Sequence, residues 1–269
     1  MPEISVIMGV YNTNNETIVL ESINSILNQT FSDIELIICD DGSTDGTFEL
    51  LQNISRSDKR IKLVKNETNL GLAATLNHCI RISNADLIAR MDADDIADPN
   101  RLAIQLKFIK QNPQYALVGC NSILFDETGE WGYREMPQKP QNKDFLFRSP
   151  FIHPSILIYK SALLAVNNYR VNKETLRCED YDLFMRLYVE GYKGYNIQSP
   201  LMKFRENRDA YSRRKYKYRI DEAKVRQKGF KSLGLMPKGF LYVVKPLIVG
   251  MLPQRFLAIL RREKSSVKE

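Results

Sequence analysis

Short apolar runs alternate with amphipathic segments along the first 95 residues. The runs predict strands at residues 4–8, 34–39, 61–64 and 87–91, and the segments between them predict helices at 16–28, 47–54 and 72–82. Thr13, followed by Glu16, predicts a capping box at the start of the first helix. Apolar strands joined by crossover helices are typical of a parallel sheet covered on both faces, in which ligands bind beyond the carboxyl ends of the strands.

The pattern is more mixed after residue 95. It predicts a helix between Pro99 and Asn112, strands at 116–125 and 154–159, and an amphipathic helix at 180–190. Prolines at 137, 140 and 150 indicate irregular connections between these elements. We find no internal repeat, so one α/β body is expected to extend to about residue 204.

Residues 205–269 form a basic tail. They carry 18 Lys and Arg against 6 Asp and Glu, a net charge of +12, whereas residues 1–204 carry −5. The apolar stretch from Phe240 to Leu260 is interrupted by Lys245, Pro246 and Pro253, so it is too broken to span a bilayer. It suits an amphipathic segment on an anionic membrane surface. A helix packed on the body is the alternative, because spacing alone does not separate the two.

Composition narrows the class of protein. With 43% hydrophobic and 26% charged residues, the 269-residue chain has the composition of a folded domain. Four cysteines without a CxxC pair, together with two histidines, exclude a Cys/His zinc site and indicate a reducing, cytoplasmic setting. The start lacks a basic segment followed by a long apolar one, so no signal peptide is expected.

An acidic cluster, Asp92-Ala93-Asp94-Asp95, directly follows the fourth predicted strand. Carboxylates crowded at a strand end repel each other unless a hard cation neutralises them, and such cations complete their shell with phosphate oxygens. The cluster therefore indicates a divalent-metal site for a nucleotide diphosphate. The alternative is a solvated acidic turn in which Asp98 caps the next helix.

Two further acidic groups have comparable positions. Asp40-Asp41-Gly42-Ser43 follows the second strand, where a carboxylate can accept the N–H of a base, while Tyr11 after the first strand offers a ring for stacking. Glu179-Asp180-Tyr181-Asp182 opens a helix. Acidic residues there usually just oppose the helix dipole, but one that stays ionised in a cleft can serve as general base toward a hydroxyl.

Seven ordered motifs resemble family 2 glycosyltransferases, in particular those of bacterial O-antigen and capsule biosynthesis. They are Val6 to Asn12, Asn28 to Phe31, Asp40 to Asp45, Asn69 to Gly71, Met91 to Asp95, His153 to Ser155 and Glu179 to Leu183. The resemblance implies a GT-A fold, meaning a Rossmann-like mixed sheet flanked by helices, with a nucleotide-sugar-binding half (1–95), an acceptor-binding half (96–204) and the basic amphipathic helical tail (205–269).

The same resemblance implies roles for individual residues. Asp180 is the expected catalytic base, and Asp94 with Asp92 the DxD pair that binds Mn²⁺ or Mg²⁺. The residues expected to bind the donor nucleotide are Tyr11, Asp41, Asp92, Gly9 and Asn69, and those expected to contact the acceptor are His153, Glu179 and Asp182. His153, beside Pro154, can equally hold a loop.

The implied reaction is inverting transfer of one sugar from a UDP-sugar to a glycan acceptor. The chain lacks the QxxRW motif and the transmembrane helices of processive members. Many relatives have an Arg-x-His motif near the end of the catalytic region, where Arg205-Glu206-Asn207 has Asn in place of His. With the basic tail, the resemblance favours a polyprenyl-diphosphate-linked acceptor met at the inner face of the cell membrane.

Three other classes stay open from the residues. A nucleotide-sugar-binding protein without turnover would keep the pocket but not need Asp180. Tyrosines interleaved with Lys and Arg at 211–218 are compatible with nucleic-acid binding by the tail. A nucleotidyltransferase is disfavoured, because Gly9-Val10-Tyr11-Asn12 is not a Gly-rich loop with basic residues.

Overall fold

The structure, a computed structural model, describes residues 1–13, 15–206 and 216–251. Its centre is one mixed sheet, in which the described strands lie in the order β3-β2-β1-β4-β8-β6-β9-β5, with β7 paired to the far end of β6. The strands are β1 (Ile4–Val10), β2 (Ile34–Asp40), β3 (Ile61–Lys65), β4 (Leu87–Arg90), β5 (Ile96–Ala97), β6 (Leu117–Asp126), β7 (Gly129–Arg134), β8 (Leu157–Tyr159) and β9 (Gly194–Arg205).

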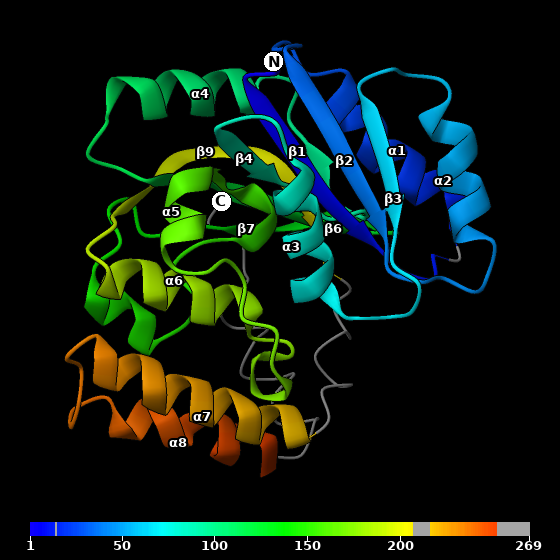
Figure 1. Cartoon of the computed structure of the whole chain (residues 1–269). Helices are drawn as coiled ribbons and strands as arrows, with labels where there is room; N and C mark the ends of the chain where they lie inside the picture. The colour runs from blue at the N-terminus through cyan, green and yellow to red at the C-terminus, as the bar shows by residue number, and fades with distance from the viewer. Residues whose placement is uncertain (14, 207–215, 252–269) are drawn as a thin grey trace.

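Helices cover both faces of this sheet (Figure 1). They are α1 (Glu16–Leu27), α2 (Thr47–Ser55), α3 (Leu72–Ile82), α4 (Arg101–Gln111), α5 (Lys160–Ala165), α6 (Glu179–Val189), α7 (Tyr216–Ser232) and α8 (Phe240–Met251). The mixed sheet between helices confirms the GT-A expectation.

Strand β1 shows why both faces are apolar. Val6 and Met8 pack with residues of α1, α2 and α4, whereas Ile7 between them packs with residues of α3, α5 and α6. Successive strand residues point to opposite faces, so a strand buried on both sides needs a continuous apolar run. The four strands of the first half, β3 to β4 in sheet order, are parallel as expected.

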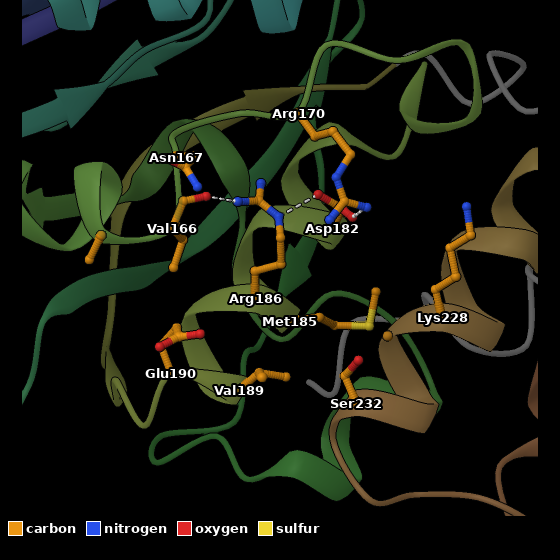
Figure 2. A pocket seen from close by; sticks show the side chains of 12 residues that line it. Val166, Asn167, Arg170, Asp182, Met185, Arg186, Val189, Glu190, Lys228 and Ser232 are labelled. Carbon is orange, nitrogen blue, oxygen red and sulfur yellow. Dashed lines mark hydrogen bonds and ion pairs between the residues drawn. The ribbon is translucent and has the colours of Figure 1, made fainter.

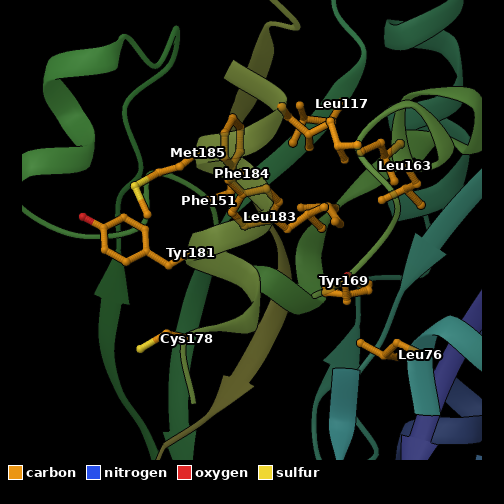
Figure 3. Packing of buried hydrophobic residues seen from close by; sticks show 14 of the residues in the cluster. Leu76, Leu117, Phe151, Leu163, Tyr169, Cys178, Tyr181, Leu183, Phe184 and Met185 are labelled. Atoms are coloured by element: carbon orange, nitrogen blue, oxygen red, sulfur yellow. The ribbon is translucent and has the colours of Figure 1, made fainter. Parts of the chain in front are cut away.

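The second half joins the sheet in antiparallel fashion. Strand β8 pairs antiparallel with both β4 and β6, and this places α6 over the same face as α3. Figure 3 shows Phe151, Leu183 and Phe184 gathered with Leu117 in the resulting core. The core therefore fixes the start of α6 relative to the first half of the sheet.

Two local expectations need correction. The first helix is capped by Asn15, whose side chain accepts from the Ile18 N–H, and not by a Thr13 capping box. The backbone N–H of Thr13 instead donates to Thr47 Oγ1, 2.9 Å away, so this residue ties two loops together. The long strand β9 had no counterpart in the sequence pattern; it contains Pro200, and its register against β6 shifts twice.

The helical part of the tail packs on the body. Helix α7 lies against α6 and α8 (Figure 1), and Phe230 and Val243 are buried in the same core as α6. Arg226 is also buried, with its Nη1 donating to the Leu146 carbonyl at 3.0 Å. Within the described ranges, no helix is both long and apolar enough to cross a bilayer. The Tyr211 to Lys215 and Phe256 to Lys264 parts of the tail lie outside the described residues.

We predict that Phe230→Ala lowers the free energy of unfolding by about 3–5 kcal/mol, because it opens a cavity where a fully buried ring joined α7 to the body. Urea unfolding followed by circular dichroism measures the change. Phe240→Ala on α8 is the matched control, since that ring is 54% exposed and its loss should cost far less. Equal midpoints for the two variants would contradict the packing of α7.

Candidate active site

The first four strands end at one edge of the sheet and bring distant loops together there. The N–H of Asp41, after β2, donates to the carbonyl of Val10 at the end of β1 (2.8 Å), and the N–H of Asn66, after β3, donates to the carbonyl of Asp40 (2.8 Å). Met91, after β4, is bonded in the same way to Ile7. Tyr11, Asp41 and Asp92 thus lie along a common edge, as the order of the strands requires.

Asp41 anchors the loop that follows β3. Its Oδ1 accepts from Asn66 Nδ2 (2.8 Å) and the Leu70 N–H (2.9 Å), and its Oδ2 accepts from the Gly71 N–H (2.8 Å). The neighbouring Gly42 has φ +70°, and a Cβ there would lie 2.5 Å from the carbonyl carbon of Thr68. This anchoring role was not foreseen, and a direct contact of Asp41 with a base stays a prediction.

Asp40 is the carboxylate at this strand end with unused acceptor capacity. It is fully buried; Oδ2 accepts from the Ser43 N–H at 3.1 Å, and Oδ1 has no hydrogen-bond donor among the described residues. A buried carboxylate oxygen without a donor is energetically costly. Asp40 is therefore a second candidate for a ligand N–H, one that sequence reasoning passed over in favour of Asp41.

The same edge of the sheet carries three other residues that were expected to bind the nucleotide, Tyr11, Gly9 and Asn69. The ring of Tyr11 is 48% exposed, as a surface for stacking requires, and Asn12 beside it binds the Ser43–Thr44 loop. Gly9 packs closely on α3, because a Cβ there would lie 3.1 Å from Thr75 Cγ2. Asn69 Oδ1 accepts from the Gly71 N–H at 3.1 Å. Contacts of the three residues with a nucleotide stay predictions.

The acidic cluster gathers three carboxylates. Asp92, Asp94 and Asp95 each offer an oxygen, and these oxygens lie within 4.8 Å of one another. Burial, and to a smaller extent the charge of Asp92, raises the pKa of Asp94 to about 6. Part of the Asp94 residue is nevertheless exposed to solvent. Burial and the charges of Asp92 and Asp94 raise the pKa of Asp95 well above its usual range. The three groups are thus held close at an electrostatic cost.

This cluster fits a hard divalent cation. Carboxylate oxygens are the ligands that Mg²⁺ and Mn²⁺ prefer. Asp95 Oδ1 accepts from the Arg205 N–H at 2.8 Å, whereas its buried Oδ2 has no donor among the described residues. A carboxylate oxygen without a hydrogen-bond donor, in a group of other carboxylates, can coordinate a metal ion. Asp92 and Asp94, the expected DxD pair, each offer an oxygen close to Asp95, the last residue of the acidic cluster, and their binding of a metal stays a prediction.

Arg205, the last residue of β9, contacts the acidic cluster. Besides the bond to Asp95, its Nε donates to the Asp94 carbonyl at 2.9 Å, and its guanidinium lies 4.4 Å from the centre of the Phe125 ring. Sequence reasoning left Arg205 out, because the Arg-x-His motif to which it belongs is incomplete here. The structure shows that this arginine supports the loop of the acidic cluster through its backbone and side chain.

Glu179 and Asp180 begin α6 and face the same region. Burial and the neighbouring charge of Glu179 raise the pKa of Asp180 to about 6. Burial also raises the pKa of Glu179, whose Oε2 is buried without a donor among the described residues. A carboxylate with a pKa near 6 is still ionised at neutral pH and is a stronger base than an ordinary aspartate, which suits a general base.

His153 and Tyr169 form a pair behind these carboxylates. His153 Nε2 and Tyr169 Oη are 2.7 Å apart, and burial with the nearby Arg90 charge lowers the pKa of His153 well below its usual value. The imidazole is therefore neutral at pH 7. This contact supports the loop-holding interpretation of His153, and a contact with the acceptor stays a prediction.

Asp182 is held in ion pairs away from Asp180. Its Oδ1 lies 2.9 Å from Arg170 Nη1 and its Oδ2 2.7 Å from Arg186 Nε (Figure 2). These groups line a cavity of about 230 Å³ between α6 and α7. Since both oxygens of Asp182 are engaged, the structure favours a role in holding the 166–170 loop over its expected contact with the acceptor.

Comparisons with known proteins identify the family. The family described as "Glycosyl transferase family 2" matches residues 5–171. EpsE of Bacillus subtilis (strain 168), which carries the name of a glycosyltransferase, is 42% identical over 94% of this chain and 90% of its own length. An Escherichia coli UDP-Gal:alpha-D-GlcNAc-diphosphoundecaprenol beta-1,3-galactosyltransferase is 28% identical over 95% of this chain and 94% of its own.

A solved structure shows the same fold. The mannosyltransferase PcManGT from Pyrobaculum calidifontis, in complex with GDP-Man and Mn²⁺, matches 98% of this chain and 79% of its own with a TM-score of 0.64 and 16% sequence identity. At this level of identity the likeness concerns the arrangement of the strands and helices.

We predict that Asp41→Asn loosens the loop at residues 66–71. The amide that replaces Oδ2 does not accept from the Gly71 N–H, which then keeps only its longer, 3.1 Å bond to Asn69 Oδ1. The amides of Leu70 and Gly71 should exchange with deuterium at least about tenfold faster, corresponding to roughly 1.4 kcal/mol, while β1 amides stay protected. Unchanged exchange at Gly71 would show that Asp41 is not the anchor.

Proposed function

Because the chain belongs to glycosyl transferase family 2, we propose that it moves one sugar from a UDP-sugar to a hydroxyl of a lipid-linked glycan, with inversion and with a bound divalent cation. The observation that carries this proposal is the meeting of the Asp92, Asp94 and Asp95 carboxylates with the α6 carboxylates around one buried cation, Arg90. The product belongs to surface polysaccharide, and the enzyme works on the cytoplasmic face of the membrane.

The donor lies along the strand ends in this proposal. Tyr11 stacks on the base, and a carboxylate at the end of β2, Asp40 or Asp41, accepts its N–H. Asp92, Asp94 and Asp95 hold Mn²⁺ or Mg²⁺, which when bound neutralises the diphosphate as it leaves. The name of the Escherichia coli relative, with UDP-Gal and a diphosphoundecaprenol acceptor, supports both UDP and the lipid-linked acceptor. The Mn²⁺ of the mannosyltransferase complex supports the metal, and its GDP-Man leaves guanine as the alternative base.

Asp180 removes the proton from the attacking hydroxyl. Its carboxylate is ionised at neutral pH and sits in a buried setting that strengthens its basicity. The hydroxyl oxygen then forms the new bond at the anomeric carbon as the bond to the diphosphate breaks, with no covalent enzyme intermediate. The hydrogen-bonded pair of neutral His153 and Tyr169 supports the position of this base.

An exposed apolar face on α8 supports a membrane contact. Leu241, Ile248 and Met251 are 77%, 56% and 74% exposed and recur at the spacing of one helical face, with Lys245 beside them. The opposite face, with Val243 and Pro246, is buried. Exposed apolar patches flanked by basic residues favour an anionic lipid surface. We therefore place the enzyme peripherally on the membrane, with α8 toward the lipid.

We predict that Asp180→Asn abolishes sugar transfer while UDP binding stays within a few-fold of wild type. In wild type, kcat/KM should fall as pH drops through about 6, because protonation removes the base. Glu179→Gln should move this acid limb to lower pH, since it removes the like charge that raises the Asp180 pKa. Assays with UDP-sugars and a polyprenyl-diphosphate glycan measure both effects.

Full transfer by Asp180→Asn would remove this residue from the mechanism. A wild-type protein that binds UDP but transfers no sugar to any acceptor would favour the alternative of a binding protein without turnover.

We predict that replacing both Leu241 and Ile248 by Glu lowers binding to phosphatidylglycerol-containing vesicles at least about tenfold, because two apolar side chains no longer enter the interface. Sedimentation with vesicles measures the binding. Leu164→Glu on α5, also an exposed leucine at 53%, is the matched control. Equal sedimentation of all three proteins would contradict the α8 contact, and a gel shift with RNA would then test the nucleic-acid alternative.

A further inference from the structure

Arg90 is a buried cation beside the acidic cluster. It ends β4, two residues before Asp92, and is 2% exposed. Its Nη2 forms an ion pair with Asp92 Oδ1, whereas its Nε and Nη1 have no acceptor among the described residues. A guanidinium buried with unused donors is costly, so it needs a compensating interaction.

The surrounding charges supply that compensation. Asp92 and Asp95 stabilise the charged form of Arg90, and Arg90 in turn stabilises the ionised forms of Asp94, Glu179 and Asp180. Arg90 thus lies between the carboxylates of the metal cluster and those of α6. Arg205 adds a second positive charge that stabilises the ionised form of Asp94.

We propose that Arg90 is a built-in counter-cation, which keeps the affinity of the acidic cluster for a divalent cation low until a nucleotide diphosphate is bound. This inference rests on the donor site of the proposed function. Arg90 is a positioning residue here, because it acts through Asp92.

Two physical effects support this role. The guanidinium already occupies one oxygen of Asp92, so an incoming cation competes with it for that oxygen. Its positive charge also repels a second cation in a setting where water screens little. A diphosphate adds negative charge and further oxygen ligands, which offsets both effects. The metal and the nucleotide are therefore expected to bind cooperatively, each tightening the other.

The test is a Mn²⁺ titration of the full chain, with free Mn²⁺ read by electron paramagnetic resonance, without UDP and with saturating UDP. A pH of 8 limits the competition of protons with the metal at Asp94, whose pKa is about 6. The variants are Arg90→Gln, which removes the charge, and Arg90→Lys, which keeps it. Arg226→Gln is the matched control, because it also removes a buried arginine, on α7, that pairs with Glu222.

We expect Arg90→Gln to bind Mn²⁺ without UDP about tenfold or more tighter than wild type, as one nearby charge shifts proton affinity by a similar factor. UDP should then tighten Mn²⁺ binding less than it does in wild type. Arg90→Lys should stay within about threefold of wild type, and Arg226→Gln should match it. Thermal unfolding offers a second readout, since Mn²⁺ should raise the Tm of Arg90→Gln more than that of wild type.

Mn²⁺ binding by Arg90→Gln that is equal to or weaker than that of wild type would overturn the inference. So would a wild-type protein that binds Mn²⁺ equally well with and without UDP. Neither result bears on the proposal that the donor site binds a nucleotide. That proposal fails only if wild type does not bind UDP at all. In that case, the comparison of Mn²⁺ binding by wild type and Arg90→Gln without UDP still decides the role of Arg90.

Discussion

The mutual repulsion of Asp92, Asp94 and Asp95 is the constraint around which the site is built. Their oxygens lie within 4.8 Å of one another, and burial raises the pKa of Asp94 and Asp95. Two arginines offset part of this repulsion, Arg90, two residues before Asp92 at the end of β4, and Arg205 at the end of β9. A divalent cation can offset the repulsion that remains, and a diphosphate can complete its shell of oxygen ligands.

The proposed reaction also needs a base that faces this cluster, and the fold positions one candidate. The antiparallel pairing of β8 with β4 lays α6 on the face that also carries α3, and a shared core with α7 and α8 holds it there. Asp180 at the start of α6 is then close enough to Arg90 for their charges to interact. The packing of α7 and α8 therefore helps to fix the position of Asp180, the proposed base.

The sequence pattern was sufficient for the first half of the fold, because each strand there is buried on both faces and each helix has one apolar face. It was not sufficient for α7, whose buried face carries Asp221, Glu222 and Arg226 and so hides the helical period. It missed β9 because Pro200 and two register shifts interrupt the alternation. At the site, motif positions pointed to Asp92, Asp94 and Asp180, and Asp95 was placed in the acidic cluster but not in the DxD pair. The contact of Arg205 with Asp95 was missed because the two residues lie 110 positions apart, and the ion pair of Arg90 was missed because a buried strand pattern does not show it.

The most direct test is the position of Mn²⁺ in crystals grown with UDP, located by anomalous scattering at the manganese edge. The account predicts one strong peak in contact with the Asp92 to Asp95 carboxylates and with the UDP diphosphate, on the side that faces Asp180. A peak bound elsewhere, or a diphosphate bound away from these carboxylates, would contradict the account.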